Sequence, residues 1–197
     1  MKLLAATGNK HKIEEFAGIL EPLGVEFVSP DEIGGIPEPE ENGTTFEENA
    51  AIKAIEAANF ADIPAFADDS GLEVEALDNA PGIYSSRYAE NDEKRIARVL
   101  KELEEAEKNT GISNRRARFV CVAAFAEPGM EPVTFRGEVY GTIIREPRGE
   151  GGFGYDPVFV PDGYDRTFAE LPAEVKNTIS HRSAALKKAA DFFRELN

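Results

Sequence analysis

The chain has 197 residues, 42% of them hydrophobic and 30% charged, which is typical of one globular domain rather than a disordered segment. Asp and Glu number 37 against 22 Lys and Arg, a net charge of −15, so a broad nucleic-acid-binding face is disfavoured because it needs clustered positive charge. The lone cysteine, Cys121, excludes an intrachain disulfide framework, and no apolar run approaches the roughly 20 residues of a membrane span. We therefore expect a soluble, cytoplasmic protein with no membrane or nucleic-acid partner.

The N-terminal segment predicts a strand, a helix and a second strand. Residues 2–6 are an apolar run typical of a buried strand, and Thr7-Gly8-Asn9 after it favours a turn and a helix cap. The apolar spacing of an amphipathic helix follows, at Ile13, Phe16, Ala17 and Leu20. Residues 25–28 predict the second strand, and residues 29–43, rich in Pro, Gly and Glu, predict a long loop.

A second helix is predicted to begin with the capping-box pattern at residues 45–48. Its apolar face continues through Ala50, Ala54 and Ala57. Residues 64–67 predict a short buried strand, and Asp68-Asp69-Ser70-Gly71 predicts a turn before the apolar residues 72–74.

The second half of the chain predicts a helix, a central strand, a further strand and a last helix. Apolar residues between 96 and 103 recur at helical spacing, and residues 119–125 are almost all apolar, as in a strand buried on both faces. Residues 133–144 are strand-like but interrupted by Gly137 and Gly141, and the last helix is expected to follow His181-Arg182. Strands that alternate with helices around a central hairpin predict a mixed-sheet α/β fold.

Charge is unevenly distributed along the chain. Eleven carboxylates and no Lys or Arg lie between Ile13 and Ile52, whereas five basic residues follow residue 175. A small polyanion held by a few bases, with a metal ion bridging to the acids, would suit this asymmetry. The alternative is a solvated acidic face without a function.

The junction of the first strand and helix is a candidate phosphate site. Thr7-Gly8-Asn9 would place free backbone N–H groups and the positive end of the helix dipole together, with Lys12 one turn further on. An ordinary capped helix with a surface lysine is the alternative. The P-loop pattern is absent.

A glycine-rich stretch at residues 149–154 matches G-x-G-x-x-G formally. A dinucleotide-binding turn would need a helix to begin there, but Pro157 and a β-rich segment follow, so we reject that interpretation. A loop that lets a ligand approach the backbone is favoured over a merely flexible one, because Phe153 and Tyr155 among the glycines could stack on a base.

The adjacent acids Asp68 and Asp69 are the strongest local chemical signal. Two neighbouring carboxylates repel each other, so such a pair tends to recruit a cation or share a proton. With an acid from the long loop, such as Glu41, they could hold Mg²⁺, which favours carboxylates together with substrate phosphates. A plain turn is the alternative.

Bases near the last predicted helix are candidates for binding an anion or a carbonyl. Lys176, His181 and Arg182 can each donate to a phosphate or to a carbonyl-bearing base. Helix capping and surface charge are the alternative roles.

Six stretches of the chain together resemble the inosine triphosphate pyrophosphatase family, which acts on non-standard purine nucleotides. They follow one another in the family's order along nearly the whole chain, and the ordered set is more specific than any single stretch. The stretches are Ala6-Thr7-Gly8-Asn9 with Lys12, Thr45-Phe46-Glu47-Glu48-Asn49-Ala50 with Lys53, Ala67-Asp68-Asp69-Ser70-Gly71-Leu72, Pro81-Gly82-Ile83-Tyr84-Ser85 with Arg87, Gly151-Gly152-Phe153-Gly154-Tyr155-Asp156-Pro157, and Ile179-Ser180-His181-Arg182.

The resemblance implies an elongated mixed β-sheet flanked by helices, with two lobes and a central cleft, formed by residues 1–197 as one domain and usually as a homodimer. It also implies Mg²⁺-dependent hydrolysis of ITP, dITP and XTP between the α and β phosphates. The products would be a nucleoside monophosphate and pyrophosphate, and the role would be cleansing of the nucleotide pool.

By the same resemblance, Asp69 is the proton acceptor for the attacking water, and Glu41, Asp69 and Asp68 bind Mg²⁺. One carboxylate cannot easily be both a metal ligand and a base, so the role of Asp69 stays open between the two. A donor from Arg182 or Lys176 to a 6-keto oxygen would disfavour adenine roughly ten- to hundred-fold. The residues implied to bind substrate are Thr7, Gly8, Asn9, Lys10, His11, Lys12, Lys53, Ser70, Phe153, Gly154, Tyr155, Asp156, Lys176, His181 and Arg182.

Two alternative functions stay open. One is a pyrophosphatase for other modified nucleotides on a related fold. The other is a nucleotide-binding sensor without catalysis, which would have no need of Asp68, Asp69 and Glu41 together.

Overall fold

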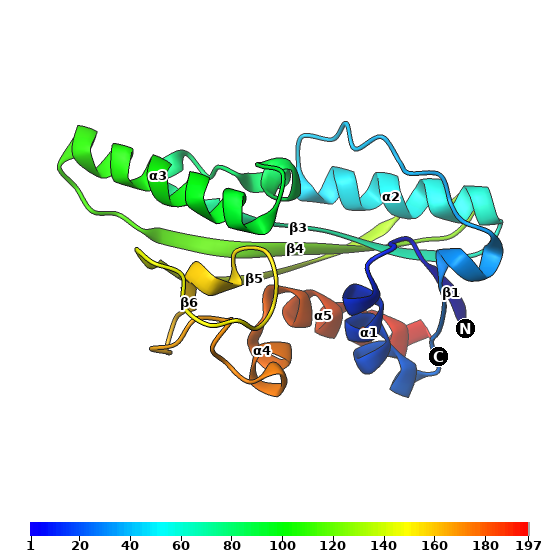
Figure 1. Cartoon of the computed structure of the whole chain (residues 1–197). Helices are drawn as coiled ribbons and strands as arrows, with labels where there is room; N and C mark the ends of the chain where they lie inside the picture. The colour runs from blue at the N-terminus through cyan, green and yellow to red at the C-terminus, as the bar shows by residue number, and fades with distance from the viewer. Residues whose placement is uncertain (197) are drawn as a thin grey trace. The chain divides into compact units, whose positions relative to one another are not determined.

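A computed structural model describes residues 1–196. The chain alternates strands and helices and forms one six-stranded sheet, in the order β2-β1-β3-β4-β5-β6 (Figure 1). The strands are β1 (Lys2–Ala5), β2 (Glu26–Val28), β3 (Ala65–Val74), β4 (Arg116–Ala126), β5 (Val133–Ile143) and β6 (Phe159–Pro161). The helices are α1 (Lys10–Leu20), α2 (Phe46–Ala61), α3 (Asp92–Thr110), α4 (Ala173–Ile179) and α5 (His181–Leu196).

The sheet is mixed, as the sequence predicted. Strand β1 pairs in parallel with both β2 and β3, whereas β5 and β6 are antiparallel. Strand β4 is almost continuously buried, in agreement with its apolar sequence. Among residues 1–196, no helix is both long and apolar enough to cross a membrane.

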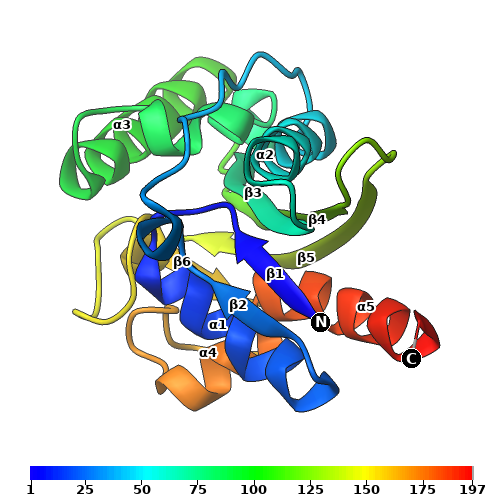
Figure 2. The same ribbon diagram turned by 90° about the vertical axis from the view of Figure 1, so that its right-hand side faces the viewer.

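The chain divides into two compact units, each with its own core. Within the described residues, unit 1 comprises residues 1–69, 121–137 and 182–196. Within it, α2 lies over one face of the strands and α1 and α5 over the other (Figures 1 and 2). Its core includes Phe16, Phe66 and Phe193, with the rings of Phe16 and Phe66 5.1 Å apart.

Unit 2 comprises residues 70–120 and 138–181. Helix α3 packs one apolar stripe, Ile96, Val99 and Leu103, into the core of this unit. On the opposite side from α3, the unit contains β6 and α4 (Figure 1).

The predicted turn at Asp68-Asp69-Ser70-Gly71 is wrong, because these residues lie inside the continuous strand β3. Turn-forming residue types express a weak local preference, which tertiary contacts override. In β3, cations from neighbouring elements pair with both aspartates, so the strand can carry buried carboxylates.

Two further boundaries differ from the sequence prediction. Strand β5 runs through Gly137 and Gly141 without interruption. At Gly141 a Cβ atom would come within 2.3 Å of the Val160 carbonyl oxygen, so the glycine permits close pairing with β6. His181 and Arg182 do not precede the last helix but form its first two residues, after the cap at Ser180.

Candidate active site

The N-terminus of α1 is held by its own side chains. The Asn9 side-chain oxygen accepts hydrogen bonds from the backbone N–H groups of His11 and Lys12, at 3.0 and 3.4 Å. The Thr7 hydroxyl oxygen accepts from the Asn9 N–H group at 3.2 Å. The helix therefore begins at a fixed position, with the positive end of its dipole and Lys12 in the same turn.

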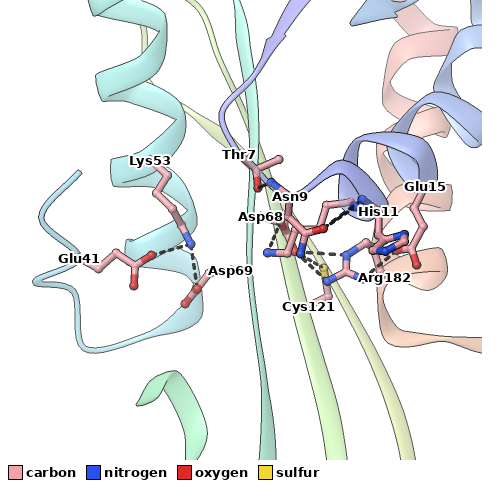
Figure 3. A network of polar contacts seen from close by, with 11 residues as sticks. Thr7, Asn9, His11, Glu15, Glu41, Lys53, Asp68, Asp69, Cys121 and Arg182 are labelled. Carbon is pink, nitrogen blue, oxygen red and sulfur yellow. Dashed lines mark hydrogen bonds and ion pairs between the residues drawn. The ribbon is translucent and has the colours of Figure 1, made fainter. Parts of the chain in front are cut away.

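Asp68 is a fully buried carboxylate that contacts two cations in unit 1. The Lys12 Nζ atom lies 2.7 Å from Asp68 Oδ1. The Nε and Nη2 atoms of Arg182 each lie 3.3 Å from Asp68 Oδ2 (Figure 3). Burial alone would raise the pKa of Asp68, but the charges of Lys12 and Arg182 hold it well below its ordinary value. Asp68 is therefore ionised across the ordinary pH range.

Asp69 takes part in a different cluster. The Lys53 Nζ atom lies 2.9 Å from Asp69 Oδ1 and 3.0 Å from Glu41 Oε1, so one ammonium joins the two carboxylates. The buried Asn49 side chain donates to Asp69 Oδ2 at 3.4 Å and accepts from the Gly43 N–H group at 2.9 Å. Helix α2 places Asn49 and Lys53 four residues apart and so on one face.

The two neighbouring aspartates belong to opposite sides of the strand. Successive side chains of a β-strand point to opposite faces of the sheet. Figure 3 shows Glu41, Lys53 and Asp69 on one side of β3 and Asp68 with Arg182 on the other. The structure thus brings Glu41 and Asp69 together and does not bring Asp68 to them.

The environment of Asp69 favours a proton acceptor. Burial raises the pKa of Asp69 above its ordinary value, and the nearby charges of Glu41 and Asp68 add to this, although Lys53 opposes it. A carboxylate with a raised pKa takes up a proton more readily than an exposed one. The pKa of Lys53 is also raised: burial lowers it, but Asp69 and Asp68 outweigh that effect, so the ammonium stays charged.

The donor set at Lys53 fits a magnesium ion. Among residues 1–196, no three His, Cys, Asp or Glu side chains are grouped to hold a metal. Two carboxylate oxygens, from Glu41 and Asp69, nevertheless converge on one cationic atom. Mg²⁺ is commonly bound through one or two carboxylates, with substrate phosphates and water as its other ligands.

Unit 2 carries an exposed aromatic ring beside a lysine. The Phe153 side chain is 41% exposed, and the Lys176 Nζ atom lies 4.8 Å from the centre of its ring. Lys176 is ion-paired with the buried Asp156, whose Oδ2 atom also accepts from the Phe153 N–H group at 2.9 Å. This cluster combines a ring face, a cation and a carboxylate, which are the groups that recognise a heterocyclic base.

Tyr155 does not share the exposure predicted for it. Its side chain is buried in the core of unit 2, and its hydroxyl donates to the Ser85 carbonyl oxygen at 2.9 Å. The ring is therefore engaged in packing and is not presented for stacking on a base. The neighbouring Gly154 N–H group donates to Asp92 Oδ2 at 2.7 Å, which ties the glycine-rich loop to the start of α3.

The remaining predicted residues are placed as follows. Lys10 and His11 lie on the exposed surface of α1, where the His11 ring pairs with Glu14 at 3.6 Å. His181 is buried in unit 2, with its ring stacked on Phe119 at 4.9 Å. Gly8 is exposed in the turn before α1, and Ser70 is partly exposed in β3.

Three residues that contact predicted site residues, two in unit 1 and one in unit 2, were missed by the sequence analysis. Asn49 bonds to Asp69, Glu15 accepts from Arg182 Nη1 at 2.8 Å, and Asp92 bonds to Gly154. For Asn49 a signal existed, since it is a polar residue on an otherwise alanine-rich helix face one turn before Lys53. For Glu15 and Asp92 the sequence held no such signal, because their partners Arg182 and Gly154 lie far away along the chain.

Comparison with known proteins relates the chain to one family. Residues 3–192 match the model of the Ham1 family. The chain is 49% identical to the dITP/XTP pyrophosphatase of Desulforamulus reducens, over 100% of this chain and 97% of that protein. It is also similar to the solved structures of a HAM1 protein from Coxiella burnetii (TM-score 0.92, 43% identity, 99% of each chain) and of the Staphylococcus aureus Ham1 protein (0.87, 38%, 100% of each chain).

Proposed function

Since the chain belongs to the Ham1 family, we propose that this nucleoside triphosphate pyrophosphatase hydrolyses the non-standard purine nucleotides ITP, dITP and XTP. Water attack between the α and β phosphates would yield the monophosphate and pyrophosphate. This reaction removes such nucleotides from the precursor pool. The observation that carries the proposal is the convergence of Glu41 and Asp69 on the Lys53 ammonium, beside a second ion pair between Lys12 and Asp68, the residue before Asp69 in β3.

The basic residues of unit 1 would bind the triphosphate. Lys12 and the positive end of the α1 dipole are suited to phosphate oxygens, while the backbone N–H groups of His11 and Lys12 already donate to Asn9. Lys53 is a charged, mostly buried ammonium that would donate to a second phosphate group. Thr7 and Asn9 would keep this end of the helix in place.

Asp69 would accept the proton of the attacking water. Its raised pKa and its hydrogen bond from Asn49 give it an appropriate basicity and a fixed orientation. Glu41 and Asp69 would hold Mg²⁺, which supplies neutralisation of charge on the leaving pyrophosphate when bound. A cation at this place suits a chain of net charge −15 that must bind a highly anionic substrate.

The unit 2 cluster would select the base. Phe153 offers a ring for stacking, and Lys176 a donor to a 6-keto oxygen, which inosine and xanthosine carry and adenine lacks. Lys176 suits this role better than Arg182, because Arg182 is almost fully buried and is held by Asp68 and Glu15. The location in the cytoplasm and the homodimer stay predictions.

The test is identification of the products. The chain, incubated with ITP and Mg²⁺, should give inosine monophosphate and pyrophosphate in equal amounts on anion-exchange chromatography. With excess EDTA the reaction should stop, and added Mg²⁺ should restore it. Release of inorganic phosphate and a diphosphate instead, or binding of ITP without turnover, would contradict the proposal.

A further inference from the structure

We propose that Asp68 is a positioning residue that holds the Lys12 ammonium in place for the nucleotide's phosphates, and that it is not a ligand of the metal. This inference rests on the proposed function and deepens it. It separates the duties of two adjacent carboxylates that sequence alone would assign to one ion.

The contacts of Asp68 account for both of its oxygens. Oδ1 lies 2.7 Å from Lys12 Nζ, and Oδ2 accepts from two nitrogens of Arg182 at 3.3 Å. The Cys121 thiol lies 3.8 Å from the same Oδ2 atom. The side chain has no exposed surface, so a metal ion at Asp69 would have no open path to it on this side of β3.

Lys12, unlike Asp68, is partly exposed and has further hydrogen-bond donors. Its side chain is 19% exposed, whereas that of Asp68 is fully buried. An ammonium has three N–H groups, so Lys12 can donate to Asp68 and still donate to a phosphate oxygen. A flexible four-carbon side chain loses rotamer freedom when it is fixed, and Asp68 fixes it before the nucleotide arrives.

Arg182 holds the second oxygen of Asp68, the one that Lys12 does not contact. The Arg182 side chain is 4% exposed, and its guanidinium lies between Asp68 and Glu15, with Nη1 2.8 Å from Glu15 Oε2. The carboxylate of Asp68 is thereby fixed by an element, α5, that does not carry Lys12. Figure 3 shows Arg182 between Glu15 and Asp68. The position of the ammonium at the start of α1 thus depends on β3 and α5.

The experiment is a double-mutant cycle on Asp68→Asn and Lys12→Met. Asp68→Asn should raise KM for ITP roughly 10- to 100-fold, the effect of losing one hydrogen bond to a charged group, with a smaller change in kcat. In the Lys12→Met background the same substitution should change KM less than about threefold, because the ammonium that it positions is gone. If the KM of the double variant rose by the product of the two single-variant increases, the proposal would be overturned.

The alternative role as a metal ligand predicts a different readout. If Asp68 bound the ion, Asp68→Asn would raise the Mg²⁺ concentration for half-maximal activity at saturating ITP, in both backgrounds. The proposal predicts that this concentration does not change. Asp191→Asn, which removes an exposed carboxylate paired with Arg194 on α5, serves as the matched control and should alter neither value.

Two additions keep the result decisive. If Asp68→Asn does not fold, Asp68→Glu retains the charge and displaces the carboxylate by one methylene, so KM should rise while the Mg²⁺ dependence stays unchanged. Calorimetric binding of ITP in EDTA repeats the cycle without turnover. If the wild-type chain binds ITP but does not hydrolyse it, the proposed function fails, and the Kd values of the variants still test whether Asp68 positions Lys12. If the wild-type chain does not bind ITP, both the proposed function and the role of Asp68 fail.

Discussion

Asp69 occupies the point where β3 faces α2, and its carboxylate receives a hydrogen bond from Asn49 and an ion pair from Lys53. Asp69→Asn keeps the shape of the side chain but removes its charge and replaces one acceptor oxygen with a donor NH2 group. We expect kcat for ITP to fall by about 100- to 10,000-fold, the range that general acid–base catalysis contributes. Pyrophosphate release measures the loss, and an unchanged thermal unfolding curve shows that the fold is intact. Wild-type turnover by this variant would contradict the role of Asp69.

Lys176 offers a second test at the scale of one residue. Lys176→Met removes the donor to a 6-keto oxygen, so the preference for ITP over ATP, as a ratio of kcat/KM, should shrink about 10- to 100-fold. The ratio is internal to each variant, so a general loss of stability from leaving Asp156 unpaired cancels. Lys176→Arg, which keeps a charged donor, is the control. An unchanged ratio in Lys176→Met would show that Lys176 does not read the base.

At the scale of the element, the glycine-rich loop is determined by close contacts rather than by flexibility. Gly152 has a φ of +71°, and a Cβ atom there would come within 2.1 Å of Asp156 Oδ2. That oxygen also receives the Phe153 N–H group and the Lys176 ammonium. A side chain at position 152 therefore cannot be added without moving Asp156.

Gly152→Ala should disturb this loop with little effect on the rest of unit 2. We expect kcat/KM for ITP to fall roughly 10- to 100-fold, since a displacement of about 1 Å in a binding residue has effects of this size. Steady-state kinetics checks the expectation. Gly163→Ala is a matched control, because Gly163 also has a positive φ (+83°) but has no atoms near its Cβ position. Equal losses in the two variants would indicate backbone strain as the cause.

The end of α3 is joined to its neighbours by a carboxylate. Glu107 accepts from Arg115 Nε and from the Ser113 hydroxyl, each at 2.7 Å, and pairs with Arg145 at 2.9 Å. The hydrogen bonds from Arg115 and Ser113 lower the pKa of Glu107 to about 2 from 4.5. Because the folded-state pKa is depressed, its stabilising contribution is present above about pH 4.5 and is lost as the pH falls towards 2.

Glu107→Gln should therefore lower the free energy of unfolding at pH 7. The gap between the unfolding free energies of the variant and the wild type should narrow as the pH falls from 4.5 to 2. Urea unfolding at a series of pH values measures this. Glu104→Gln, on an exposed position of the same helix, is the control and should show no such trend. A difference that stays constant with pH would mean that the ionisation of Glu107 is not involved.

Most elements could be predicted from periodicity. The apolar spacing that begins at Ile13 becomes α1, the capping pattern at Thr45 starts α2, and the apolar run from residue 119 becomes the core of β4. Strand β3 could not be predicted as one element, because the local preference of Asp68 to Gly71 for a turn is overridden by cations 15 or more residues away.

The candidate site, like the fold, was predicted from the sequence only in part. Residue types and order pointed to Lys12, Lys53 and Asp69, which the structure places in two clusters of charge on opposite sides of β3 in unit 1. The separate duties of Asp68 and Asp69 follow from the alternation of a strand, which a predicted turn concealed. The burial of Tyr155 depends on packing in unit 2, which a pattern of glycines and aromatics does not specify.

At the scale of the whole molecule, charge and function are linked. The chain carries −15, yet Lys12, Lys53 and Arg182 are gathered around β3 in unit 1, each against a carboxylate. These cations are positioned before a ligand binds, whereas the acidic surface elsewhere repels anions. The arrangement favours a small, highly charged anion accompanied by a metal ion over an extended polyanion.

The most direct test of this account compares pyrophosphate release from ITP, XTP and ATP by the wild-type chain in Mg²⁺. The account predicts rapid release from ITP and XTP, with the monophosphate as the other product, and slow release from ATP, whose base lacks the 6-keto oxygen. Equal rates for ATP and ITP would contradict the assigned selectivity, and tight binding of ITP without release of pyrophosphate would contradict the assigned reaction.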